Sequence, residues 1–222
     1  MAFSTVAKFS IAIGTVGGAT GFAIGAQKLF SKGPSISELI KSKNPEKRLL
    51  NKNATKEAWK AAWKSYREAQ QNREKDIWNI EGWKKGNLTS DEEAPEAFKK
   101  GCESRVTGSS QLYDEVVSYC TRNTTLADLV ADDSGRKLLV KVDSGNTPEW
   151  KAVWAAYKQT NTNKANNQDE WKLNNWATDH QKTEAPVAFM DKCKTNSETE
   201  GFNPKSTLYE QLLKYCTSVV FK

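Results

Sequence analysis

Histidine is nearly absent from this chain, which has one imidazole, that of His180, in 222 residues. One histidine leaves little material for acid–base catalysis or for a histidine-bound metal, and no spacing typical of zinc ligands occurs. A glycine-rich phosphate loop, a dinucleotide-binding fingerprint and a nucleophile elbow are also missing from the sequence. The sequence therefore predicts no catalytic, metal-binding or cofactor-binding residues, and we expect a protein that is not an enzyme.

Long apolar runs are missing after residue 26, and the mean hydropathy is low, at −0.72. A chain without a second apolar stretch cannot form a channel or a carrier by itself. Residues 1–54 hold eight basic and two acidic side chains, and residues 55–222 hold 25 of each, so the net charge of +6 lies beside the N-terminus. This distribution argues against nucleic acid as a partner and favours contact with anionic membrane lipid.

The aromatic residues and cysteines occur in pairs that indicate a tandem duplication. All eight Trp, six Tyr and four Cys recur at offsets of 91, 93 or 96 residues. The pairs, with the phenylalanine that accompanies them, are Trp59/Trp150, Trp63/Trp154, Tyr66/Tyr157, Trp78/Trp171, Trp83/Trp176, Phe98/Phe189, Cys102/Cys193, Tyr113/Tyr209, Tyr119/Tyr215 and Cys120/Cys216.

The duplication predicts an all-α protein with three parts. Residues 1–30 form a membrane segment with its flank, residues 31–125 a first small helical bundle, and residues 126–222 a second one. The strongest helix signal comes from the first three aromatic pairs, which lie at i, i+4 and i+7 and so share one face of a helix. Strand signals are few, and residues 138–140 are the best short candidate.

An uncharged stretch of 18 residues, 9–26, is the one long apolar segment. Its length is at the short end for a membrane-spanning helix and long for the core of a signal peptide. We expect a retained anchor, with a cleaved signal peptide and a soluble buried helix as alternatives. Gly17, Gly21 and Gly25 would form a smooth stripe through which two such helices could pack as a homodimer. Glycine is, however, common in membrane segments generally.

The four cysteines occupy equivalent positions, two in each repeat, and predict the disulfides Cys102–Cys120 and Cys193–Cys216. Three connectivities exist in principle, and the duplication favours this one because each ancestral unit had to fold alone. Disulfides persist in oxidising compartments, so this pairing places the repeats outside the cytoplasm. The alternative is four buried free thiols, since free cysteine is itself common in cores.

The sequence gives conflicting signals for membrane orientation. Lys28, Lys32, Lys41 and Lys43 follow the apolar segment and Lys8 precedes it, and a lysine excess of this kind keeps the adjacent part of a chain in the cytoplasm. The cysteines favour the opposite orientation. We give the cysteines more weight, because the lysine rule is a statistical bias, and expect a single-pass protein of the cell membrane with an extracellular C-terminal part.

Aromatic residues could also bind a carbohydrate or choline, because their faces stack on sugars and on organic cations. The helical spacing of the first three pairs favours a core role for those residues. Trp78, Trp83, Trp171 and Trp176 lack that spacing, and they are the candidates for ligand-facing aromatics.

The motifs together resemble one group of proteins. A glycine-rich hydrophobic N-terminus, a Trp-x-x-x-Trp-x-x-Tyr helix, an Ala-Pro-x-x-Phe-x-x-x-Cys block and a Tyr-Cys-Thr ending are similar to the paralogous uncharacterised membrane and surface protein families of haemotropic mycoplasmas. The resemblance covers most of the chain, and its motifs are structural. It implies membrane association and antigenic variation at the cell surface, and it supplies no activity and no functional residues.

We therefore expect a membrane-anchored surface protein that contacts a host protein or cell surface, or that displays variable antigens. The alternatives are a cytoplasm-facing membrane scaffold with reduced cysteines and a secreted ligand-binding module. The redox state of the cysteines distinguishes the scaffold, and the loss of residues 1–26 distinguishes the secreted module.

Overall fold

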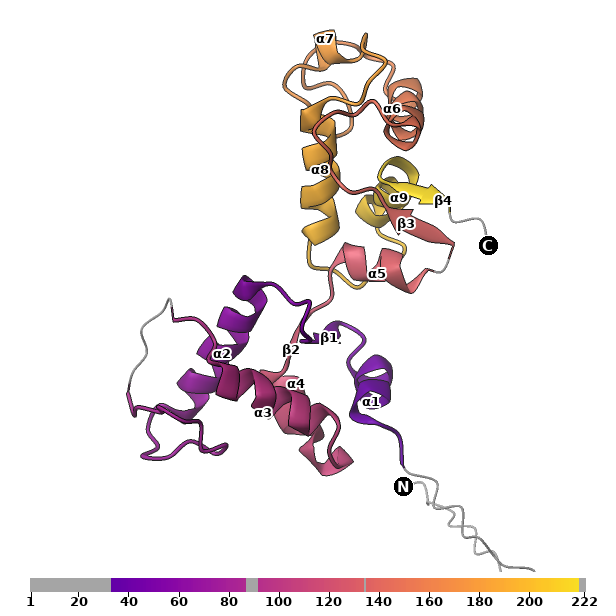
Figure 1. Ribbon diagram of the computed structural model, residues 1–222. Coiled ribbons are helices and arrows are strands. Elements are labelled where there is room, and N and C mark those ends of the chain that lie inside the picture. Colours follow the sequence, from indigo (N-terminus) through magenta and orange to yellow (C-terminus); the bar gives the residue numbers. More distant parts are fainter. Residues whose placement is uncertain (1–32, 87–91, 134, 220–222) are drawn as a thin grey trace, which may run out of the picture. The chain divides into compact units, whose positions relative to one another are not determined.

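The computed structural model describes residues 33–86, 92–133 and 135–219 (Figure 1). The apolar segment at residues 9–26, with its glycine stripe, lies outside the described residues. Among the helices of the described part, none combines the length and the apolar content needed to cross a bilayer. The described chain is mostly helical, with short strands and two disulfides.

The two repeats share one succession of elements, to which the first adds the 3-10 helix η1 and the second adds the short helix α7 (Figure 1). The first repeat contains α1 (Ile36–Lys43), β1 (Lys47–Leu49), α2 (Lys56–Gln70), α3 (Glu96–Val106), the 3-10 helix η1 (Ser110–Leu112), α4 (Tyr113–Tyr119) and β2 (Thr121–Asn123). The second contains α5 (Leu126–Asp132), β3 (Arg136–Leu138), α6 (Pro148–Thr160), α7 (Trp176–Asp179), α8 (Val187–Glu198), α9 (Thr207–Tyr215) and β4 (Thr217–Val219).

Local hydrogen bonds explain where the helices begin. At the start of α1, the Glu38 carboxylate accepts from the backbone N–H of Ser35 at 2.7 Å. At the equivalent place in α5, the Asp128 carboxylate accepts from the backbone N–H of Thr125 at 2.8 Å. Thr147 caps α6, and a proline occupies the first helical turn. These contacts satisfy the N–H groups that have no partner within a helix, so each copy starts its helices by the same means.

Two small antiparallel sheets, which the all-α prediction did not include, accompany the predicted helices. β1 pairs with β2, and β3 pairs with β4, each over three residue pairs. The second strand of each sheet follows directly after the second cysteine of its repeat. A strand of three residues is too short to show an alternation of apolar and polar side chains. The paired residues Lys47 and Asn123 are also 76 positions apart, so no local sequence pattern could reveal the pairing of β1 with β2.

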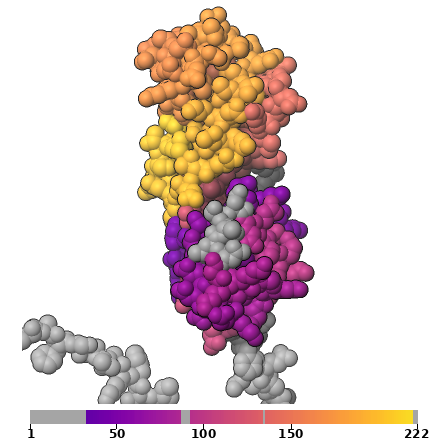
Figure 2. All heavy atoms as spheres, turned by 90° about the vertical axis from the view of Figure 1, so that its left-hand side faces the viewer, coloured from indigo at the N-terminus to yellow at the C-terminus, as the bar shows by residue number. Residues whose placement is uncertain are grey.

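Each repeat encloses a hydrophobic core of its own. The first core is built from residues between Ile36 and Cys120, and the second from residues between Leu126 and Cys216. The first three aromatic pairs lie inside these cores, each side chain at most 6 % exposed, which confirms their predicted structural role. In the space-filling view, the first repeat (indigo to magenta) and the second (orange to yellow) are each closely packed (Figure 2).

Candidate functional site

One disulfide lies in each repeat, with the connectivity that the duplication favours. Cys102 on α3 is bonded to Cys120 at the end of α4, and Cys193 on α8 is bonded to Cys216 at the end of α9. All four side chains are at most 2 % exposed. Beside the first bridge, the Leu50 N–H donates to the Cys120 carbonyl at 2.9 Å, and the second repeat has the same bond at the same length. Each bridge therefore joins two helices and the small sheet into one unit.

A buried Tyr–Asp pair holds the loop between α2 and α3. The Tyr66 hydroxyl donates to the Asp76 carboxylate, which also accepts from the backbone N–H groups of Trp78 and Ile80, both at 2.8 Å. Asp76 is only 3 % exposed, so three donors replace the water that a carboxylate would otherwise need. These bonds fix residues 76–80 of the loop to Tyr66 on α2.

The second repeat contains the same arrangement. The Tyr157 hydroxyl donates to Asp169 at 2.6 Å and accepts from the Trp171 N–H at 2.8 Å, while the Leu173 N–H donates to Asp169 at 2.9 Å. Sequence reasoning missed both aspartates, although the pattern Asp-x-Trp-x-Ile/Leu occurs in both copies. The residue after each of these tryptophans has a positive φ, 51° in the first repeat and 53° in the second, so the copies share the backbone turn as well.

Burial raises the pKa of Tyr66 and Tyr157 above the ordinary range for tyrosine, and the hydrogen bond to a carboxylate adds to the effect. A phenolate at either position would stand beside a carboxylate in a site that excludes water. Both hydroxyls therefore stay protonated at neutral pH and act as hydrogen-bond donors. The two hydroxyls therefore have a structural role, which is to hold the loop that follows α2 or α6.

The four candidate ligand-facing tryptophans lie against the two cores. Trp176 is fully buried and Trp171 is 7 % exposed, so neither offers a ring face to solvent, and the prediction for these two is corrected. Trp78 and Trp83 are half-buried and pack against the first core. Their departure from helical spacing reflects a loop that folds back onto the core, and it does not signal exposure.

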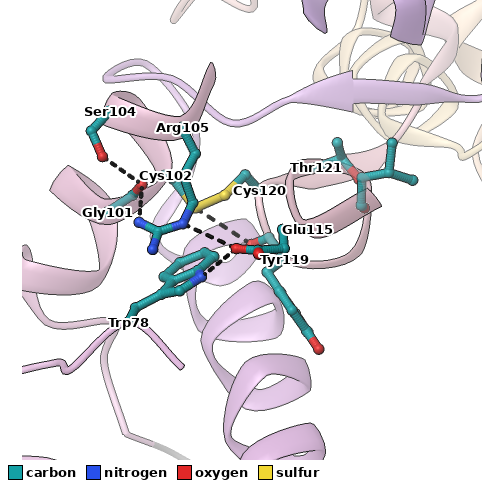
Figure 3. The surroundings of a disulfide bond; sticks show 10 residues. Trp78, Gly101, Cys102, Ser104, Arg105, Glu115, Tyr119, Cys120 and Thr121 are labelled. Atoms are coloured by element: carbon teal, nitrogen blue, oxygen red, sulfur yellow. Dashed lines mark hydrogen bonds and ion pairs between the residues drawn. A yellow bond between two sulfur atoms is a disulfide. The ribbon is translucent and has the colours of Figure 1, made fainter. Parts of the chain in front are cut away.

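A salt-bridged arginine covers the Trp78 ring (Figure 3). The guanidinium carbon of Arg105 lies 4.0 Å from the ring centroid, a cation–π distance. The Glu115 carboxylate accepts from the Trp78 indole nitrogen at 2.7 Å and from Arg105 Nε at 3.1 Å. Phe98 also stacks on the ring, with centroids 5.4 Å apart. The Trp78 ring is thus already in contact with Arg105 and Phe98, which leaves it poorly suited to stack on a ligand.

Two neighbouring hollows on the first repeat could hold a ligand. The larger of the two, which we call the groove, has a volume of about 590 Å³. The smaller, which we call the Trp59 cavity, has a volume of about 310 Å³. Both are lined by Lys52 and Glu103, so the two hollows adjoin. The apolar part of the groove consists of Ile40, Leu49, Leu50 and Val106.

Within residues 33–86, 92–133 and 135–219, no group of three His, Cys, Asp or Glu side chains is arranged to hold a metal ion. No protein-family model, curated protein or solved structure matches the chain.

Proposed function

We propose that this chain is a membrane-anchored cell-surface protein whose two repeats are stapled display modules that contact host molecules or vary as antigens. The observation that carries the proposal is the pair of buried disulfides, one within each repeat. Disulfides persist in oxidising compartments, and a basic flank beside an apolar segment suits attachment to an anionic membrane. In this proposal residues 9–26 supply the anchor, on the strength of their sequence.

The way the two copies differ supports a display role. The separation of the bridged cysteines grows from 18 residues in the first repeat to 23 in the second. The second repeat accommodates the added residues between α8 and α9, where the chain joins the two bridged helices. A disulfide that holds the core while a loop changes length suits a surface that varies.

Labelling of intact cells with a membrane-impermeant, lysine-reactive reagent tests the location. We expect labelled peptides from both repeats before the cells are lysed. Labelling that requires lysis would contradict an extracellular location and favour the cytoplasm-facing scaffold, which the lysine excess after the apolar segment supports. Release into the medium of a chain that lacks residues 1–26 would favour the secreted module.

A further inference from the structure

The two repeats differ at two indole nitrogens. Trp63 Nε1 is buried without a hydrogen-bond partner, while its counterpart Trp154 Nε1 donates to the Lys182 carbonyl at 3.1 Å. The second difference, at Trp59 and Trp150, lies beside a surface hollow. In the second repeat, Trp150 Nε1 donates to the Val140 carbonyl at 3.1 Å, so the chain itself occupies this donor. In the first repeat, the indole N–H of Trp59 makes no hydrogen bond within the part of the chain that the structure describes, although Trp59 is only 6 % exposed. Trp59 lines the Trp59 cavity. Trp59 Nε1 is not among the fully buried nitrogens that lack a partner, so an acceptor from outside the chain can reach it.

Basic side chains surround the two hollows. Lys41, Lys47, Arg48 and Lys52 line the groove, against one carboxylate, that of Glu103. Two of these cations are engaged: Lys47 donates to the Asn123 side chain at 2.8 Å, and Arg48 pairs with Asp132 at 2.5 Å. Lys41 and Lys52 form no ion pair with any residue that the structure describes. They remain available to an anion.

The acidic residues of the Trp59 cavity other than Glu103 are already paired. Glu93 lies 3.7 Å from Lys56, and Glu96 lies 2.7 Å from Lys99. Lys100 also lines the cavity and has no ion pair among the described residues. The charged residues of the Trp59 cavity outside these two ion pairs are Lys52, Lys100 and Glu103, and their net positive charge favours the binding of an anion there.

The second repeat lacks this combination. Lys141, the counterpart of Lys52, is held by the Asp191 carboxylate. Lys99 corresponds to Met190, which is fully buried, and Lys100 corresponds to Asp191 itself. The two repeats therefore have equivalent cores, but only the first has unpaired lysines and an indole N–H without a hydrogen bond near Trp59.

We infer that the first repeat, unlike the second, binds a single-chain lipid with an anionic head group. The acyl chain lies in the groove, and the head group reaches Lys52 and the Trp59 indole N–H. A volume of about 590 Å³ is in the range of small-molecule sites, which combine a mostly apolar lining with a few placed polar groups. The aliphatic stems of the surrounding lysines extend the apolar surface while their ammonium groups face the head group. The inference does not depend on the cell-surface location.

Nuclear magnetic resonance of the full-length protein with ¹⁵N-labelled tryptophan tests this site. The probe is lysophosphatidylglycerol, added below the concentration at which it forms micelles. We expect the Trp59 indole N–H resonance, assigned with a Trp59→Phe variant, to move on titration, while that of Trp150 stays fixed. Lysophosphatidylcholine with the same chain should bind much more weakly, and glycerol phosphate, which has no chain, should not move the resonance.

A double variant, Lys41→Glu with Lys52→Glu, should weaken binding by roughly tenfold or more, because two unpaired cations become anions. Lys137→Glu is the matched control, since Lys137 is exposed on β3, the strand that corresponds to β1. It should bind as the wild type does. An equal response to glycerol phosphate would mean a plain anion site and overturn the inference. A double variant that binds like the wild type, or a shift of Trp150 alone, would place the lipid elsewhere and overturn it too.

Discussion

Replacing Tyr157 by phenylalanine isolates the contribution of the buried Tyr–Asp pair. Phenylalanine keeps the ring, so no cavity forms and the loss reports on the hydroxyl group. That hydroxyl donates to the Asp169 carboxylate at 2.6 Å and accepts from the Trp171 N–H at 2.8 Å. A hydrogen bond to a charged group contributes about 1.5–3 kcal/mol, and an unsatisfied buried N–H costs about 1–3 kcal/mol. We expect Tyr157→Phe to lower the free energy of unfolding by about 3 kcal/mol.

The matched control for this variant is Tyr209→Phe in the same repeat. Tyr209 is 6 % exposed, and its hydroxyl donates to the Leu129 carbonyl at 3.3 Å, a longer bond to a neutral acceptor. Such a bond contributes about 0.5–1.5 kcal/mol, so the control should lose about 1 kcal/mol. Urea unfolding of the full-length proteins, followed by tryptophan fluorescence and near-ultraviolet circular dichroism, measures both losses. Equal losses would refute the reasoning that the buried carboxylate gives the Tyr157 hydroxyl its larger effect.

We also expect the difference in stability between the wild type and Tyr157→Phe to depend on pH in the alkaline range. The folded-state pKa of Tyr157 is raised by burial and by Asp169. The stability that this provides is complete below the unfolded-state pKa of about 10, and it is lost as the pH rises from there toward the folded-state value. The stability gap between the wild type and Tyr157→Phe should therefore narrow above about pH 10. A gap that stays constant there would mean that the hydroxyl ionises equally in both states.

Three further changes test other parts of the fold. Replacing the Cys102–Cys120 bridge by two alanines should lower the free energy of unfolding by about 3 kcal/mol, the loop-closure value for a separation of 18 residues; a loss below about 1 kcal/mol in urea melts would contradict its role as a staple. Gly145→Ala would place a Cβ 2.0 Å from the Ala185 carbonyl oxygen, so it should cost about 1–3 kcal/mol, and an unchanged Tm would show that the backbone yields freely there. Burial would raise the pKa of Asp128, but hydrogen bonds from its ion-pair partner on β2 and from the helix cap outweigh burial and lower it. Asp128→Asn should therefore be less stable than the wild type at neutral pH and converge with it as the pH falls below about 4, whereas a gap that persists in acid would exclude the charge as its cause.

The sequence was informative wherever a feature is local or was copied with the duplication. The capping threonine before Pro148 and the aromatic face of α2 follow from spacing within one helix turn or two. The cysteine pairing follows from the equivalence of the two copies, because a unit that once folded alone must close its own bridge.

Features that join distant segments could not be predicted in this way. The strands are three residues long, and their hydrogen bonds become visible only when the two ends of a repeat meet. Asp76 and Asp169 look like ordinary loop residues until the loop folds back and places them beside a buried tyrosine. Trp171 and Trp176 were candidates for exposure because they lie off the helical face, and that same fold-back of the loop buries them.

Disulfide mapping by mass spectrometry, on protein alkylated directly in its native cells, tests the proposed extracellular location most directly. We predict linked peptides that contain Cys102 with Cys120 and Cys193 with Cys216, and no alkylated thiol. Four alkylated free cysteines would contradict the location in an oxidising exterior and would support a scaffold on the cytoplasmic face of the membrane.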